Sequence, residues 1–103
     1  MAQIAQMYMR AEGVQQDFAQ AAVWWRKTAE AGNAAGMGEL GQAYAQGQGV
    51  KQDFTQAAAW FLKGAQLGSS DSMGELAKLY ASGQGVPKDP AKAKYWQDRA
   101  DKR

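Results

Sequence analysis

Three aspartates spaced 36 residues apart are the first side chains in this 103-residue sequence that suggest chemistry. Asp17, Asp53 and Asp89 would be candidates for general acid–base catalysis if two of them met at one bond. Stacked helix pairs separate equivalent positions by roughly 10 Å, which is too far for paired carboxylates. Asp is also a strong helix N-cap, and Gln20 and Gln56 stand three residues after the first two, as in a capping box. We therefore interpret the three aspartates as caps and expect no catalytic residue among them.

The composition excludes several other classes of site. The sequence has no His and no Cys, which removes the commonest general base and metal ligand, disulfides and thiolate metal sites. Twelve basic and 10 acidic residues give a net charge of +2. This small excess of positive charge does not indicate electrostatic binding to nucleic acid or anionic lipid. No apolar run approaches the roughly 20 residues that span a bilayer. We expect no cofactor, no metal, no nucleic acid and no membrane insertion, and the compartment, cytoplasmic or periplasmic and secreted, stays open.

Two Gly-x-Gly motifs, at residues 47–49 and 83–85, could suggest a loop that cradles phosphate. A nucleotide-binding loop follows a strand and has a longer glycine pattern, whereas these motifs join two helical stretches. We interpret them as structural turns.

Aromatic residues recur with the same period and would suit a platform on which bases or sugars stack. Their helical spacing favours packing in a core instead. The core prediction covers Trp24, Trp60, Trp96, Tyr8, Tyr44 and Tyr80. Trp25 is expected to be partly exposed, because its equivalents in the other units are Phe61 and Gln97.

The elements that must position these residues follow from the 36-residue period, which is typical of a repeat array. Residues 73–76 repeat residues 37–40, and each unit has the pattern helix, Gly loop, helix, Gly. Helices are expected from Met1 to Met9, from Asp17 to Gly32, from Asn33 to about Gln46, from Asp53 to Gly68, from the Ser69–Asp71 segment to Gly83, and from Asp89 onward. The sequence therefore predicts an all-α solenoid of three helix-turn-helix repeats in one domain, with units of about 1–32, 33–68 and 69–103, the first lacking its opening turn.

Glycines within one helix and polar residues in another refine this prediction. Gly36, Gly38 and Gly41 each cost about 1 kcal/mol relative to Ala, so we infer that neighbouring helices approach closely there. The last helix is polar where the preceding repeat is apolar, as expected of a solvated cap at the end of an array. The polar positions are Lys94, Gln97, Asp98 and Asp101. At the other end, Met1, Ile4, Met7 and Met9 could leave an apolar face open for self-association.

The combined motif resembles the Sel-one-like repeat, a relative of the tetratricopeptide repeat. The resemblance is carried by Leu40-Gly41-x-x-Tyr44, then Gly47-x-Gly49-Val50, then Asp53-x-x-x-Ala57-x-x-Trp60, and it covers essentially the whole chain. It implies a right-handed α-solenoid that serves as an adaptor or scaffold for proteins or peptides, in bacteria often exported. A cysteine-rich branch is linked to β-lactam hydrolysis, but this chain has none of its cysteines.

In solenoids of helix pairs the first helices line the concave face, so we expect recognition there. The polar residues of each first helix recur at i, i+3 and i+7, on one helix face. The candidate protein-binding residues are Gln3, Gln6, Arg10, Glu39, Gln42, Gln46, Glu75, Lys78 and Ser82. The sequence thus predicts a non-enzymatic module that binds a protein or peptide segment. The alternatives are a small β-lactam-type hydrolase and a purely structural, self-associating fragment.

Overall fold

The computed structural model describes residues 14–102, with side chains described from Phe18 onward. Every regular element in this range is a helix, which confirms the all-α prediction. The expected helix over residues 1–9, and with it the missing opening turn, lies outside the described residues. The helices are α2 (Val14–Glu30), α3 (Ala34–Gln46), α4 (Phe54–Gln66), α5 (Ser70–Ser82) and α6 (Pro90–Asp101).

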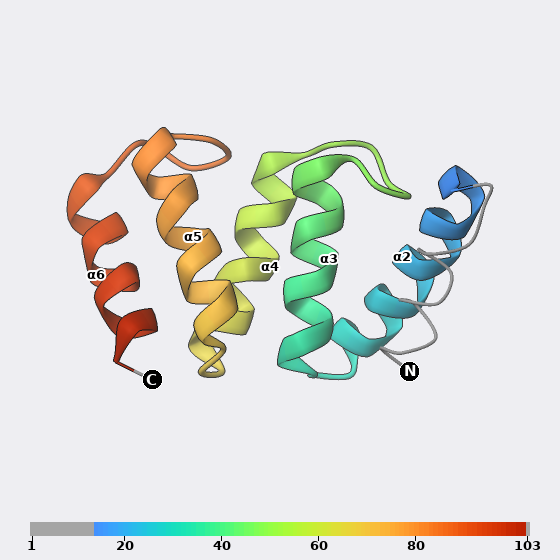
Figure 1. Cartoon of the computed structure of the whole chain (residues 1–103), viewed down its shortest axis with the longest axis horizontal. Helices are drawn as coiled ribbons and strands as arrows, with labels where there is room; N and C mark the ends of the chain where they lie inside the picture. Colours follow the sequence, from blue (N-terminus) through green and yellow to red (C-terminus); the bar gives the residue numbers. More distant parts are fainter. Residues whose placement is uncertain (1–13, 103) are drawn as a thin grey trace.

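Each helix packs against the next one along the chain, so the helices form a single stacked array (Figure 1). The hairpin of α3 and α4 is followed by the hairpin of α5 and α6, and α2 is the second helix of the unit before them. The array is the right-handed α-solenoid that the repeat predicts.

Asn33 caps α3, and the helix caps predicted at Asp53 and Asp89 are confirmed. Each side-chain oxygen accepts a hydrogen bond from the backbone N–H three residues on, at distances of 3.0, 3.1 and 3.1 Å. Ser69 caps α5 in the same way. Pro90 is the first residue of α6, where its missing N–H leaves no helical hydrogen bond unmade.

The cap predicted at Asp17 is wrong. Helix α2 begins at Val14, so Asp17 lies within the helix. In the later repeats, Asp53 and Asp89 are held before their helices because each backbone N–H donates to the carbonyl of the tyrosine nine residues earlier, at 2.9 Å.

Glycines end the helices where the sequence predicts. Gly32 and Gly68 have φ angles of 92° and 96° after the second helix of a unit. Gly47 and Gly83 have φ angles of 68° and 75° after the first helix and donate their N–H groups back to it. These left-handed conformations favour glycine and stop each helix.

The second glycine of each inter-helix loop also brings successive units into contact. Gly49 and Gly85 have φ angles of 78° and 77°. A Cβ atom on Gly49 would lie 2.1 Å from the carbonyl oxygen of Phe18, and one on Gly85 would lie 2.1 Å from that of Phe54. Each loop therefore rests on the start of the second helix of the preceding unit, and only glycine fits. The two motifs are structural turns, as expected.

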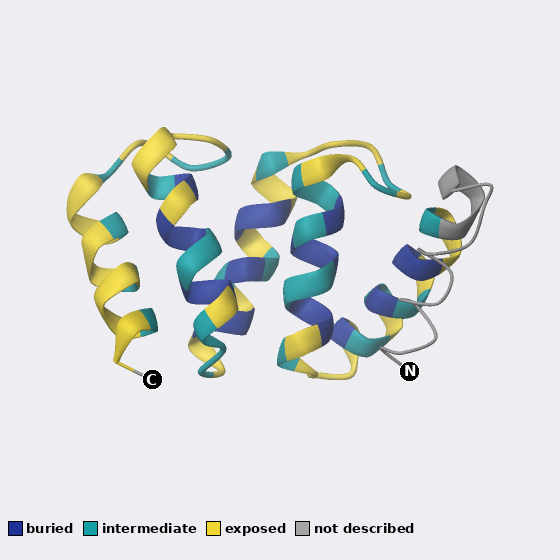
Figure 2. Cartoon of the chain, in the orientation of Figure 1, coloured by how far each residue is buried: buried dark blue, intermediate teal, exposed yellow. Residues whose placement is uncertain are grey.

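The core consists of two clusters, one around α2 and α3 and one around α4 and α5 (Figure 2). Close approach explains the glycines of α3, as inferred from the sequence. A Cβ on Gly41 would lie 2.8 Å from the ring of Phe61, which is 1% exposed, and one on Gly36 would lie 2.7 Å from Thr28. The missing side chains let a large ring pack against the backbone of α3.

The expected exposure of Trp25 is wrong, since Trp25 is only 3% exposed. It belongs to the same cluster as Met37 and Leu40 of the next helix. Its equivalent Phe61 belongs to the corresponding cluster one unit later. This position therefore packs toward the following unit whenever one is present, whatever ring occupies it.

The recurring tryptophans are half-buried and pack against the clusters from their edges. Tyr44 and Tyr80 do the same, while Tyr8 lies outside the described residues. Each tryptophan carries a cation three residues later, because i and i+3 share a helix face. The pairs are Lys27 over Trp24 at 5.8 Å, Lys63 over Trp60 at 4.6 Å and Arg99 over Trp96 at 5.7 Å from the ring centroids.

Helix α6 has no buried residue, and its exposed surface faces away from α5 in Figure 2. Lys94, Gln97, Asp98 and Asp101 are all exposed. The polar positions predicted for this helix are therefore exposed in the structure, and two of them, Lys94 and Gln97, border a groove beside α5.

Two glycine substitutions in equivalent first helices should have opposite effects on stability. Gly41→Ala should destabilise the fold by about 1–3 kcal/mol, because the added methyl group meets the buried ring of Phe61. Gly74→Ala should stabilise it by about 0.5–1 kcal/mol, because nothing lies within 4 Å of the new Cβ and alanine favours helix. Urea unfolding of both variants measures the difference. A destabilised Gly74→Ala would contradict the helical assignment of α5.

Candidate functional site

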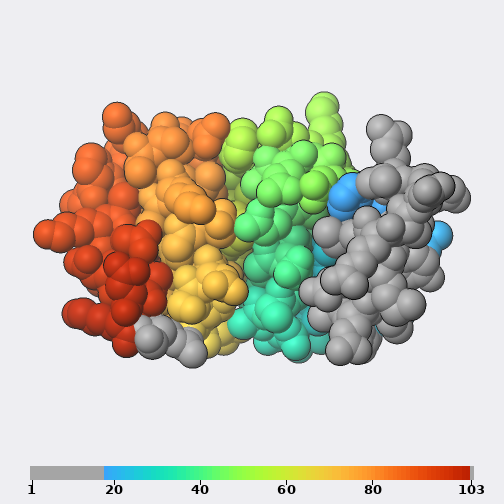
Figure 3. Space-filling model, viewed as in Figure 1, coloured from blue at the N-terminus to red at the C-terminus, as the bar shows by residue number. Residues whose placement is uncertain are grey.

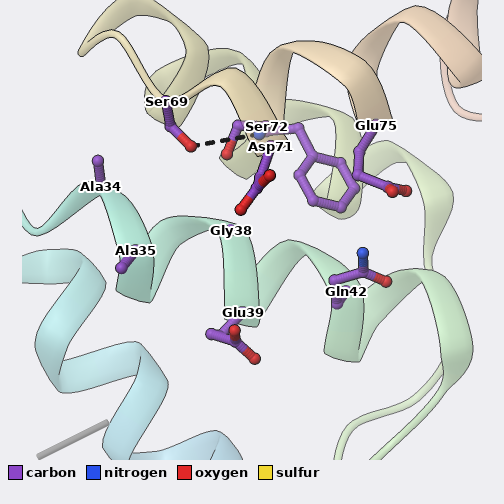
Figure 4. Close-up of a pocket in the computed structure, with 10 residues that line it drawn as sticks. Ala34, Ala35, Gly38, Glu39, Gln42, Ser69, Asp71, Ser72 and Glu75 are labelled. Atoms are coloured by element: carbon purple, nitrogen blue, oxygen red, sulfur yellow. Dashed lines mark hydrogen bonds between the residues drawn. The ribbon is translucent and has the colours of Figure 1, made fainter. Parts of the chain in front are cut away.

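A cavity of about 320 Å³ lies between the first helices of two successive units, α3 and α5 (Figure 4). Side chains of these two helices occupy the middle of one face of the molecule (Figure 3). Glu39 and Gln42 reach the cavity from α3, and Asp71 and Glu75 reach it from α5. The ring of Phe61, from α4, also lines it. The remaining lining residues are Ala34, Ala35, Gly38, Ser69 and Ser72.

Small residues keep this space open. The start of α3 presents Ala34, Ala35 and Gly38 to the cavity, and none of them extends beyond a methyl group. Helices α3 and α5 approach each other closely beside the cavity, and only short side chains fit there. A Cβ atom added to Gly38 would lie 3.3 Å from the Ser72 hydroxyl oxygen. Long side chains then line the wider part of the space.

The cavity carries negative charge on both sides. Glu39 is half-buried, and burial, followed by repulsion from Asp71, raises the pKa of its carboxyl above the ordinary 4.5. Glu75 accepts a 3.3 Å ion pair from Lys78, whose side chain is 73% exposed. No residue that lines the cavity carries a positive charge. In the described part of the chain, neither Glu39 nor Asp71 forms a salt bridge.

The Ser72 side chain adds a buried hydroxyl group. Ser72 is 1% exposed, and its Oγ has no hydrogen-bond partner among the described residues. The hydroxyl is packed between the backbones of α4 and α3, because a Cβ atom added to Gly64 would lie 2.5 Å from its oxygen and one added to Gly38 would lie 3.3 Å from it (Figure 4). A buried polar atom without a partner costs free energy, but the two glycines opposite Ser72 leave room only for a small side chain.

The structure brings three of the sequence-predicted site residues together and leaves the others apart. Glu39, Gln42 and Glu75 line the cavity. Gln46 donates to Gln42 at 3.1 Å from the next turn of α3, and Lys78 pairs with Glu75.

The remaining predicted residues do not contribute to this cavity. The Ser82 hydroxyl donates to the carbonyl of Leu79 at the far end of α5. Gln3, Gln6 and Arg10 lie outside the described residues.

Sequence reasoning missed Asp71 and Ser72. Extending the polar stripe of α5 back by one turn from Glu75 reaches both positions. The signal was therefore present, although Asp71 was interpreted only as part of the helix start. The burial of Ser72 has no signature in the sequence, because serine is usually exposed.

The Sel1 repeat family model matches residues 1–33, 34–69 and 70–100. The chain belongs to the Sel1 repeat family. Proteins of this family generally mediate protein–protein interactions and are generally non-catalytic scaffolds. The resemblance inferred from the motif is therefore confirmed, together with its solenoid fold.

Two solved structures are similar to this Sel1 repeat chain along nearly its whole length. One is a protective antigen present in uropathogenic Escherichia coli strains that displays an SLR fold, with 34% identity and a TM-score of 0.90 over 98% of this chain. The other is a Sel1 repeat protein from Oxalobacter formigenes, with 31% identity and a TM-score of 0.90, also over 98% of this chain. The chain spans 22% of the antigen and 77% of the Oxalobacter protein. No curated protein matches it.

None of the helices between residues 14 and 102 is long and apolar enough to cross a membrane. In the same part of the chain, no group of three or more carboxylates is placed to hold a metal ion.

Glu39→Gln should raise the melting temperature near pH 7 by a few degrees. The raised pKa means that the folded chain favours the protonated Glu39 carboxyl. The protonated carboxyl therefore stabilises the fold fully below the ordinary pKa, and this stabilisation is lost as pH rises through the pKa of the folded state. The neutral amide avoids that loss, and the variant should match the parent at about pH 3, where both side chains are neutral. Thermal unfolding across this pH range tests it.

Glu30→Gln is the matched control for Glu39→Gln, because Glu30 is an exposed carboxylate on α2 whose one salt bridge within residues 18–102 is to Arg26, at 4.0 Å. This change should leave the melting temperature within about 1 °C of the parent, since exposed pairs contribute little. Equal stabilisation by both substitutions would show that net charge, not the environment of Glu39, is responsible.

Proposed function

We propose that this chain is a non-enzymatic protein-interaction module that binds an extended protein or peptide segment on the concave face lined by the first helices α3 and α5. The observation that carries the proposal is the cavity between these helices, which Glu39, Gln42 and Glu75 line from two successive units. The general role of Sel1 repeats in protein–protein interaction supports it.

The chemistry of the cavity suits a segment of polypeptide. At about 320 Å³ the cavity is at the small end of ligand pockets, which matches a side chain better than a whole cofactor. Its rim presents the Gln42 amide and carboxylates, which can bond the N–H groups of an extended backbone. Glu39 and Glu75 occupy equivalent positions and are identical, whereas Gln42 and Gln46 correspond to Lys78 and Ser82 in the next unit. Variation of this kind on a constant frame can encode the choice of partner.

No observation favours the hydrolase alternative for this cavity. A hydrolytic serine needs a base within hydrogen-bond distance, and the Ser72 hydroxyl has no partner among the described residues. The self-association alternative rests on the apolar face of Met1, Ile4, Met7 and Met9, which lies outside the described residues.

A random peptide library displayed on phage, selected against the immobilised chain, tests the proposal. Gln42→Ala and Glu75→Ala should each weaken the selected peptides by roughly five-fold or more, the effect of losing about 1 kcal/mol at an interface. Gln66→Ala on α4 and Asp98→Ala on α6 remove exposed side chains elsewhere and should leave affinity unchanged.

The melting temperature of all four variants should stay close to that of the parent, because none of these side chains is buried. Peptides that lose affinity only with the α4 or α6 variant would place recognition on another face and contradict the proposal.

A further inference from the structure

A groove between α5 and α6 follows the cavity along the array and differs from it in charge. Its volume is about 300 Å³. In the described part of the chain, Lys78 of α5 and Lys94 of α6 line it, and no acidic side chain does. The cavity between α3 and α5 has the opposite composition, because its lining includes three carboxylates and no cation. Two neighbouring hollows of the array therefore carry opposite charge.

The positive charge of the groove is specific to this unit of the array. Lys78 and Lys94 occupy the positions of Gln42 and Ala58 in the preceding unit, where both positions are neutral. Both lysine side chains are exposed, so neither contributes to the core. The two charges are therefore additions to the common frame of the repeat, at positions that solvent and a partner can reach.

Both ammonium groups are available to an occupant of the groove. Lys94 forms no salt bridge in the described part of the chain, although Asp98 follows it one helical turn later. Lys78 donates to Glu75 at 3.3 Å, but its side chain is 73% exposed. An ammonium group has three donors, so Lys78 can bind a further acceptor while it keeps this pair.

Small side chains form the rest of the groove. Ala77 and Ala81 line it from α5, and Ala93 lines it from α6. Gln97 adds an amide group at its edge. The methylene groups of a short acidic side chain can pack on these methyl groups while its carboxylate accepts hydrogen bonds from the lysines.

We propose that the segment bound on the concave face carries an aspartate or glutamate where it reaches the groove between α5 and α6, and that Lys78 and Lys94 select this residue. Lys78 belongs to the predicted binding residues of the first helices, so the groove continues the proposed interaction face. The carboxylates of the neighbouring cavity repel an acidic residue, which confines the acidic position of the segment to the groove. This inference rests on the proposed function, because it names the chemistry that one part of the interaction face selects.

The test uses a peptide selected from the phage library, in which each position is replaced in turn by glutamate and by glutamine. At one position glutamate should bind roughly five-fold more tightly than glutamine at low ionic strength, the effect expected of two exposed ion pairs. The preference should fall below about two-fold at about 0.5 M NaCl, because salt screens exposed charges. Backbone amide NMR signals locate the effect, and exchanging glutamate for glutamine should change the signals of Ala81 and Ala93 more than that of Gly38.

Variants of the chain then assign the preference to the groove. Lys78→Gln combined with Lys94→Gln should abolish the preference for glutamate over glutamine. Lys51→Gln combined with Lys63→Gln is the matched control, since it removes the same charge from the loop after α3 and from α4 and should leave the preference unchanged. All four lysines are exposed, so the melting temperatures of both double variants should stay close to that of the parent.

The outcomes separate this inference from the proposed function. Peptides that shift the signals of α3 and α5 but show no position that prefers glutamate would overturn the acidic residue and leave the interaction face standing. A preference that the Lys78 and Lys94 double variant retains, or that the control variant loses, would overturn the assignment to this groove. If no selected peptide perturbs α3 or α5, both proposals fail.

Discussion

The arrangement of the whole array depends on two places where the backbones of successive units touch. Gly49 lies against the carbonyl group of Phe18, and Gly85 lies against that of Phe54, each without room for a Cβ atom. Because these contacts recur with the sequence period, each unit is placed on the preceding one in the same way. This regular placement of the units determines the spacing of α3 and α5, and therefore the cavity between them.

Small residues let the helices of the array approach one another closely. Gly41 admits the ring of Phe61 into the core, and Gly38 and Gly64 leave room for the Ser72 side chain between α3 and α4. Within the part of the chain that the structure describes, this packing leaves the Ser72 hydroxyl without a hydrogen-bond partner, which costs free energy.

The sequence predicts most of the fold because the same pattern of helices and turns occurs in each of the three repeats. The 36-residue period and the glycine positions are sufficient to predict where the helices and turns lie and where α3 is approached closely. The prediction fails where one copy differs from the others: Asp17 lies inside α2, and Trp25 is buried. Sequence spacing also identifies Glu39, Gln42 and Glu75 as polar residues of the first helices. It does not reveal that Ser72 is buried beside them, because this depends on how three helices meet.

The exposed character of α6 has a consequence for local unfolding. With no buried residue, this helix should open at the lowest free-energy cost in the described array, and its amide hydrogens should exchange before those of α3 and α4. Since α6 contributes no residue to the cavity lining, this helix can open locally while the carboxylates between α3 and α5 keep their arrangement.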